Sequence, residues 1–71
     1  MNQINLRKLL NSKWTAVNPE NRERHFIVTT VEYDEDGAVV LCEIEAVLSK
    51  RVMEIEWREL KDSEQWAHGW K

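Results

Sequence analysis

Residues 25–37 read HFIVTTVEYDEDG, and this stretch decides the fold class of the chain. Its first ten residues are mostly β-branched or aromatic, which favours an extended strand, and Asp36-Gly37 is a typical two-residue turn of a β-hairpin. After that turn, residues 38–49 predict a second long strand and residues 52–60 a third. Upstream, residues 13–17 predict a short first strand, so we expect a four-stranded antiparallel meander.

The register of this meander follows from taking Asp36-Gly37 and Lys50-Arg51 as its two turns. One face of the sheet is then apolar. Its opposed pairs are Tyr33 and Val40, Val31 and Cys42, Ile27 and Ala46, Leu48 and Met53, Ala46 and Ile55, and Ile44 and Trp57. The other face is mostly charged, but Phe26, Val28 and Leu60 also point to it. We therefore expect the N-terminal leucines and C-terminal tryptophans to cover part of this second face, or the sheet to curve into a small barrel.

Short helical turns are expected at both ends of the chain. Residues 5–11 place leucines at helical spacing, with one asparagine as N-cap and another as stop. Asp62-Ser63-Glu64-Gln65 has the form of a capping box and Gly69 is a natural terminator, which predicts a helical turn over Ser63–His68. Residues 20–24 are polar and predict a mobile loop. The predicted fold is thus mainly β, a curved sheet or small open barrel with helical turns at both termini.

The composition restricts the classes of protein to which the chain can belong. Its 71 residues suffice for one core, so residues 1–71 are expected to form a single domain. The lone cysteine, Cys42, cannot pair within the chain, and residues 1–8 lack the pattern of a signal peptide, which predicts a cytoplasmic protein. No stretch reaches the ~20 apolar residues of a membrane span. A net charge of −3 disfavours tight non-specific DNA binding.

No motif in the sequence predicts catalysis or a cofactor. His25, Cys42 and His68 lack the paired spacing of zinc ligands, so a buried thiol and two unrelated histidines are the simpler interpretation. Glutamates at positions 43, 45, 54 and 56 share one sheet face, where solvated carboxylates are the ordinary case. No hydroxyl or thiol lies beside a recognisable base. We therefore expect no catalytic residues, no metal ligands and no cofactor.

Aromatic and basic residues form the one constellation that indicates binding. Trp14 and Trp57 lie on predicted strands, and both are expected in the core. Trp66 and Trp70 are four residues apart and are expected to lie close together on one side of a helical turn. There they either cap the sheet or form a platform that stacks a base, a sugar, a proline or a cation. The candidate binding residues are Trp66, Trp70, His68, Arg58, Arg22 and Arg24.

Four short segments carry a family resemblance. They are LLNSKWTAV at residues 9–17, EAVL at 45–48, WRELKD at 57–62, and Trp66 together with Gly69-Trp70. In these segments the chain resembles the small tryptophan-rich bacterial proteins classed as a domain of unknown function, over about residues 9–71. The resemblance implies no catalytic residue, cofactor or partner. It implies a free-standing cytoplasmic bacterial protein in which the tryptophans are a shared architectural feature.

Three classes of function remain. The first is a non-enzymatic binding or adaptor module that holds a protein segment, either at an exposed sheet edge or on the aromatic and basic surface near the C-terminus. The alternative is binding of RNA or single-stranded nucleic acid, which the acidic sheet face and the net charge of −3 disfavour. An enzyme is third, because it requires a pocket that holds His25 or His68 against a glutamate. We expect a monomer or a weak homodimer.

Overall fold

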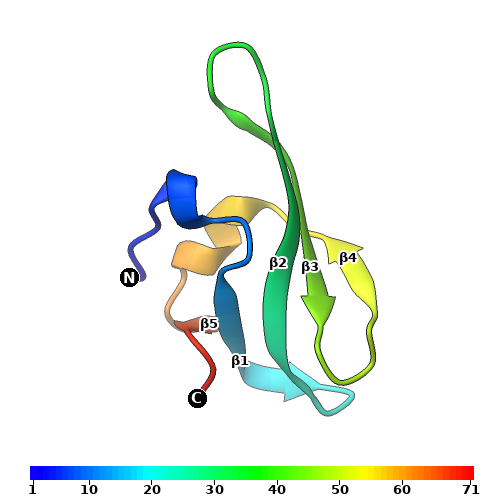
Figure 1. The fold of residues 1–71 in the computed structure, drawn as a ribbon. Coiled ribbons are helices and arrows are strands. Elements are labelled where there is room, and N and C mark those ends of the chain that lie inside the picture. Colours follow the sequence, from blue (N-terminus) through cyan, green and yellow to red (C-terminus); the bar gives the residue numbers. More distant parts are fainter.

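The computed structural model describes residues 1–71 and contains an antiparallel sheet of five strands. The strands are β1 (Lys13–Glu20), β2 (Glu23–Tyr33), β3 (Val39–Ala46), β4 (Val52–Glu54) and β5 (Trp66–His68), in the spatial order β4-β3-β2-β1-β5. Because β4 and β5 lie at opposite edges and do not pair with each other, the sheet is open (Figure 1). The predicted mainly β class is confirmed, with five strands instead of four.

The N-terminal turn forms where the sequence predicts it. η1 (Leu6–Lys8) is a single 3₁₀ turn that begins after Asn5, whose side chain accepts a hydrogen bond from the Arg7 N–H at 3.0 Å. Asn11 ends the segment in the left-handed region, with φ of 67°. Leu9, just after the turn, is buried against the sheet. Leu6 also packs against the core but Leu10 is exposed, so two of the three N-terminal leucines cover the sheet as expected.

The C-terminal third of the chain differs from the prediction. The third predicted strand stops at Glu54, and η2 (Trp57–Lys61), a 3₁₀ turn, takes the place of its second half. The predicted helical turn over Ser63–His68 is wrong. Asp62 does cap the chain, accepting from the Glu64 N–H at 2.9 Å, and hydrogen bonds to this carboxylate lower the pKa of Asp62. The helix does not continue because β5 pairs with β1.

β2 contains a bulge that changes which residues reach the core. Val31 lies opposite Cys42 as predicted, but Val28 lies opposite Ile44 and the register shifts between Val28 and Thr30. One extra residue in a strand moves the side chains beyond it to the other face. Phe26 and Val28 are therefore buried in the core, and their predicted place on the charged face is wrong.

At the end of the sheet opposite the β2–β3 hairpin, the turn between β1 and β2 is tighter than predicted and the turn between β3 and β4 is longer. Instead of a mobile loop at residues 20–24, β1 and β2 are joined by Asn21 and Arg22, both in the left-handed region with φ of 55° and 62°. β3 and β4 are joined by residues 47–50, closed by a bond from the Ala46 N–H to the Arg51 carbonyl at 2.8 Å. Ile44 consequently faces Met53, not Trp57 as predicted.

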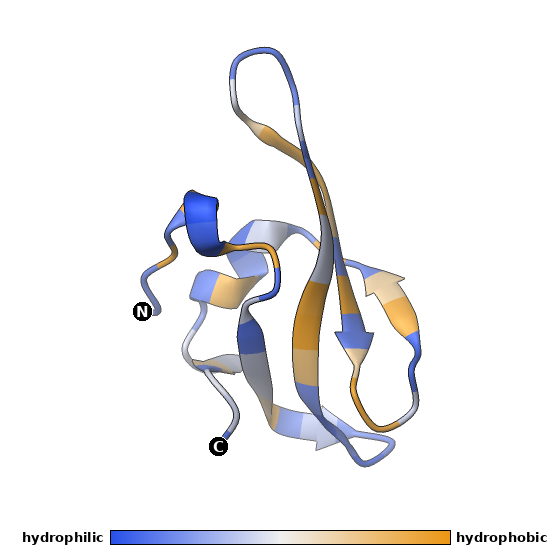
Figure 2. Ribbon diagram, viewed as in Figure 1, coloured by the Kyte–Doolittle hydropathy of each residue, from blue (hydrophilic) through white to orange (hydrophobic).

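The core lies between one face of the sheet and the two helical turns. It consists of Leu9, Trp14, Phe26, Val28, Cys42, Ile44, Ala46 and Leu60. Apolar residues lie along the middle of the long strands, whereas the tip of the β2–β3 hairpin, which projects beyond the rest of the sheet, is hydrophilic (Figure 2). Neither helical turn has the length or the apolar character needed to cross a membrane.

A buried carboxylate ties the first residue of β2 to the segment before β4. Glu23 is 4% exposed and forms an ion pair with Arg51, whose Nε donates to it at 3.0 Å, while the Ser49 hydroxyl donates at 2.5 Å. These bonds lower the pKa of Glu23 to about 2 and raise the pKa of Arg51. The pair fixes the position of β4 at its first residue.

Candidate functional site

The outer edge of β3 is only partly covered by β4. β4 pairs with Glu43–Glu45, and the next hydrogen bond on this side runs from the Ile55 N–H to the Cys42 carbonyl at 2.9 Å. The side chain of Glu56 then caps η2 by accepting from the Arg58 N–H, and the chain turns away. Residues 39–41 are left without a strand beside them on this edge.

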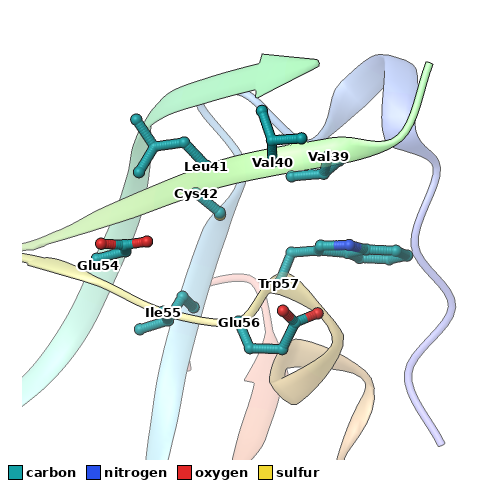
Figure 3. Close-up of a pocket in the computed structure, with 8 residues that line it drawn as sticks. All are labelled: Val39, Val40, Leu41, Cys42, Glu54, Ile55, Glu56 and Trp57. Carbon is teal, nitrogen blue, oxygen red and sulfur yellow. The ribbon is translucent and has the colours of Figure 1, made fainter. Parts of the chain in front are cut away.

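A groove of about 310 Å³ runs along this uncovered edge (Figure 3). Its lining residues are Val39, Val40, Leu41 and Cys42 on β3, and Glu54, Ile55, Glu56 and Trp57 on the facing segment. Figure 3 shows the Trp57 ring extending beneath the start of β3, and the Cys42 side chain pointing from β3 toward the facing segment. Val40 is 59% exposed. Apolar side chains and uncovered backbone therefore meet in the groove.

The Cys42 thiol on the groove wall has low reactivity at neutral pH. Its pKa is raised to about 11, first by burial and then by the negative charges of Glu56 and Glu43. A thiol attacks as the thiolate, so Cys42 is a poor nucleophile at neutral pH. The same effect indicates that the field of these carboxylates reaches the wall of the groove.

Two cations lie against the indole ring at the far end of the groove. The Arg58 guanidinium is 5.2 Å and the Lys61 ammonium 5.0 Å from the centroid of the Trp57 ring. Arg58 also binds Glu56 at 3.1 Å. Both cations are therefore occupied by groups of the same segment, and Trp57 remains only partly buried.

A second surface, which we call the Trp70 surface, lies on the face of the sheet away from the core. It consists of Lys13, His25, Trp70 and Lys71. The indole Nε1 of Trp70 donates to the Phe26 carbonyl at 3.0 Å, and its ring centroid lies 5.8 Å from that of His25 and 4.8 Å from the Lys13 ammonium. Arg24 and Lys71 line an adjoining hollow of about 410 Å³. Trp70 is 44% exposed, so this surface is basic, aromatic and open to solvent.

The predicted pairing of Trp66 with Trp70 is wrong. Trp66 packs edge-on against the Phe26 ring at 5.2 Å between centroids, on the core side of the sheet. His68 lies on the same side, 4.7 Å from the buried Trp14 ring. Trp70 lies on the opposite face, because it contacts His25, the neighbour of Phe26 in an extended strand.

The three candidate arginines fall in two places. Arg22 and Arg24 line a hollow of about 250 Å³ together with His25, next to the Trp70 surface. Arg58 lies on η2 beside the groove. The six candidate residues therefore divide among the core side of β5, the Trp70 surface and the groove.

The polar groups of the two surfaces do not form an acid–base pair. The groove holds Cys42, Glu54 and Glu56 without a histidine, and His25 shares its hollow with arginines and no carboxylate. No group of three or more histidine, cysteine, aspartate or glutamate side chains is placed to hold a metal ion. What the groove offers is backbone hydrogen-bonding groups and apolar contact.

Residues 12–71 match the protein family described as Tryptophan-rich protein (DUF2389). The chain belongs to this family. All four tryptophans, the five strands and every groove residue fall within the matched residues, whereas η1 lies outside them. No curated protein and no solved structure matches the chain. The resemblance seen in the sequence is thus confirmed, and it assigns a family whose function is unknown.

The groove of this DUF2389 protein is the feature that the sequence reasoning missed. The prediction continued the third strand through Trp57 and therefore covered the edge of β3 completely. One signal was present, because Val39, Val40 and Leu41 are consecutive apolar residues in a strand. The predicted place of Val40 on the apolar face is wrong, because the pairing of β3 with β2 shifts in register between Glu32 and Tyr33 and leaves Val40 outside the regular alternation and exposed.

Proposed function

We propose that this DUF2389 protein is a non-enzymatic protein-binding module that takes up an extended segment of a partner as an added strand beside β3. The observation that carries the proposal is the apolar groove along residues 39–41, where β3 has no neighbouring strand. In strand addition, main-chain hydrogen bonds supply affinity and pockets for alternate side chains supply specificity. The groove meets both requirements.

The backbone of β3 supports this mode of binding. The Cys42 carbonyl already accepts a bond from Ile55 across the outer edge, so the strand is oriented for pairing on that side. An added segment would lie beside β3 in line with β4, beginning where the chain turns away into η2. Its alternate side chains would contact Val40 and Trp57.

The opposite edge of the sheet is covered by other segments at Trp66, the first residue of β5. The side chain of Asn2 donates to the Trp66 carbonyl at 2.6 Å and to the Leu60 carbonyl at 2.9 Å, and its backbone N–H donates to the Lys61 carbonyl at 2.8 Å. Asn2 thus ties the N-terminal residues to η2 and to the first residue of β5. Proteins usually cover or blunt exposed strand edges, so an edge left apolar and open favours a binding role.

Strand addition can be tested with short synthetic peptides of alternating valine and a polar residue, lacking proline. We expect a peptide that binds to shift the amide NMR signals of Val40 and Leu41 and to slow their hydrogen exchange, and expect its N-methylated analogue to do neither. Val40→Pro, at an exposed position, should remove binding, and circular dichroism verifies that this variant is folded. The absence of shifts at residues 39–41 with every peptide would contradict the proposal.

Nucleic-acid binding at the Trp70 surface is the second candidate. The observation that favours it is the Lys13 ammonium over the half-exposed Trp70 indole, with Arg24 and Lys71 lining the adjoining hollow. A single-stranded oligonucleotide could stack on the ring while its phosphates contact the cations. Titration of labelled oligonucleotides at low and moderate salt tests it, with Trp70→Ala as the variant. Salt-sensitive binding that Trp70→Ala abolishes would support this candidate over strand addition.

A further inference from the structure

We infer that the segment bound at the β3 edge is basic, with lysine or arginine alternating with apolar residues. The inference rests on the proposed function and specifies its partner. It follows from which side chains flank the uncovered backbone on each face of the sheet.

The two faces beside the open edge differ in character. Residues along the β4 segment alternate, so Met53, Ile55 and Trp57 pack toward the core while Glu54 and Glu56 lie on the other face. A strand that continues the line of β4 has the same alternation. One set of its side chains meets the apolar wall, and the other set meets carboxylates.

Glu43 and Glu54 provide the strongest electrostatic argument. They are directly opposite each other in the pairing of β3 with β4. Like charges at such cross-strand positions destabilise a sheet, because their side chains project from neighbouring points on one face. A cation from an added strand on this face would relieve that repulsion.

The surrounding chain holds no compensating base. Residues 32–46 contain six carboxylates, at positions 32, 34, 35, 36, 43 and 45, and no lysine, arginine or histidine. The nearest cations, Arg58 and Lys61, lie on the Trp57 ring, and Arg58 is paired with Glu56. At the Trp57 end the added strand is therefore expected to carry an apolar residue, and its bases lie toward Glu54.

A second copy of the chain is a poor occupant of the same edge. Antiparallel pairing of two β3 edges would bring the carboxylates of residues 32–46 from both copies together, and each chain carries a net charge of −3. Like charges at an interface disfavour association. The protein can thus stay monomeric while its open edge remains available to a basic segment.

The test compares three peptides that share one pattern of alternating valines and differ only in the intervening residue, which is lysine, serine or glutamate. We expect the lysine peptide to bind about tenfold more tightly than the serine peptide at low salt, with the glutamate peptide weakest, and expect the difference to shrink at high salt. NMR titration locates the bound peptide at residues 39–41, and sedimentation shows whether the protein self-associates.

Charge reversal sharpens the test. Glu54→Lys should weaken binding of the lysine peptide by about tenfold and leave the serine peptide unaffected. Glu64→Lys, at an exposed position after η2, makes the same change in net charge and should change binding little. Circular dichroism verifies that both variants are folded.

The outcomes separate the two claims. If no peptide binds at residues 39–41, the proposed function fails and the inference with it. Equal or tighter binding of the serine or glutamate peptide leaves the proposed function standing and overturns the inference. Preference for the lysine peptide that survives Glu54→Lys, or that maps to another surface, overturns the inference too, as does dimerisation through the β3 edge that excludes the peptide.

Discussion

β1 and β3 are each flanked on the outside by a strand of three residues, yet pairing covers β1 from Lys13 to Val17, whereas it leaves residues 39–41 of β3 uncovered. β5 pairs with Trp14–Ala16, and bonds from Val17 N–H to Gln65 O at 2.9 Å and from Gly69 N–H to Lys13 O at 2.7 Å extend the pairing on both sides. Beyond β4, a single bond to Cys42 continues the pairing in the direction of the groove. The coverage of an edge is therefore decided by the residues that flank the short strand.

The difference is visible in the tryptophan on each side. Trp14 on β1 is 1% exposed beneath β5 and its neighbours, and its indole Nε1 donates to the Ser12 hydroxyl at 2.8 Å. Trp57 follows β4 and is only partly buried, with its ring in the groove. The covered side stabilises the fold, and the uncovered side leaves aromatic surface for contact.

Truncating each tryptophan should give the largest contrast between the two sides. We expect Trp14→Ala to cost about 3 to 5 kcal/mol of unfolding free energy, because it opens a cavity in the core. That is comparable with the about 3 to 5 kcal/mol that so small a domain has in total. Trp57→Ala should cost only about 1 to 2 kcal/mol.

Urea unfolding followed by circular dichroism measures both variants. Trp14→Ala should be largely unfolded without denaturant, and Trp57→Ala should unfold cooperatively at a lower midpoint. If Trp57→Ala lost as much stability as Trp14→Ala, the groove would be part of the core and not a surface for binding.

Acid should loosen the β4 side before the β5 side, because Glu23 anchors the segment before β4 through Arg51. The pKa of Glu23 is lowered from 4.5 to about 2 by the hydrogen bonds from Arg51 and Ser49. The charged pair therefore stabilises the fold above the ordinary pKa, and this contribution is lost as the pH falls from about 5 towards about 2. We expect the amides of β4 to lose protection from hydrogen exchange in that window.

The Glu23→Gln variant provides the control for this pH dependence. It should be less stable at neutral pH and should lack the slope of stability between about pH 5 and pH 2 that comes from this group. Glu64→Gln, at an exposed position, should keep the slope. A Glu23→Gln variant with the parent's slope would assign the acid sensitivity to other carboxylates.

The sequence predicted the central strands of the sheet better than either of its edges. The long strands and the burial of Trp14 follow from local patterns of β-branched and aromatic residues, but the hairpin closes between Asp34 and Ala38 and pairs Tyr33 with Val39, not with Val40 as predicted. The bulge near Thr29 could not be predicted, because a run of apolar residues at consecutive positions fits either face. Phe26 and Val28 were misplaced for that reason.

The wrong predictions in the C-terminal third of the chain have a different cause. The capping pattern at Asp62 is real, but local capping is worth less than the pairing of Trp66–His68 with β1, so the chain extends after one turn. Trp57 lies in a segment with strand-like alternation, but there the chain forms a 3₁₀ turn that Glu56 caps and that buries Leu60 in the core. The open edge of β3, and with it the groove, depends on that tertiary outcome.

The alkylation rate of the Cys42 thiol measures how accessible the wall of the groove is in solution. With a pKa of about 11, its thiolate fraction at about pH 8 is roughly two orders of magnitude below that of an ordinary thiol. We expect alkylation by iodoacetamide to be slower by at least about that factor in the folded protein than in urea. Alkylation of the folded protein at the rate of the unfolded chain would indicate that the groove opens to its wall.

The smallest loss of stability is expected when the Thr15 hydroxyl, which ties β1 to the residues after β5, is removed. The Thr15 hydroxyl is buried, donates to the Gly69 carbonyl at 2.7 Å and accepts from the Lys71 N–H at 2.9 Å. Thr15→Val keeps the shape and removes both bonds, so we expect a loss of about 1 kcal/mol and faster hydrogen exchange in β5. Thr29→Val, at an exposed site whose hydroxyl lies 3.5 Å from the Glu43 carbonyl, should be nearly neutral. Equal losses in the two variants would mean that β5 holds its edge without Thr15, and that pairing of the strand alone separates the covered side from the open one.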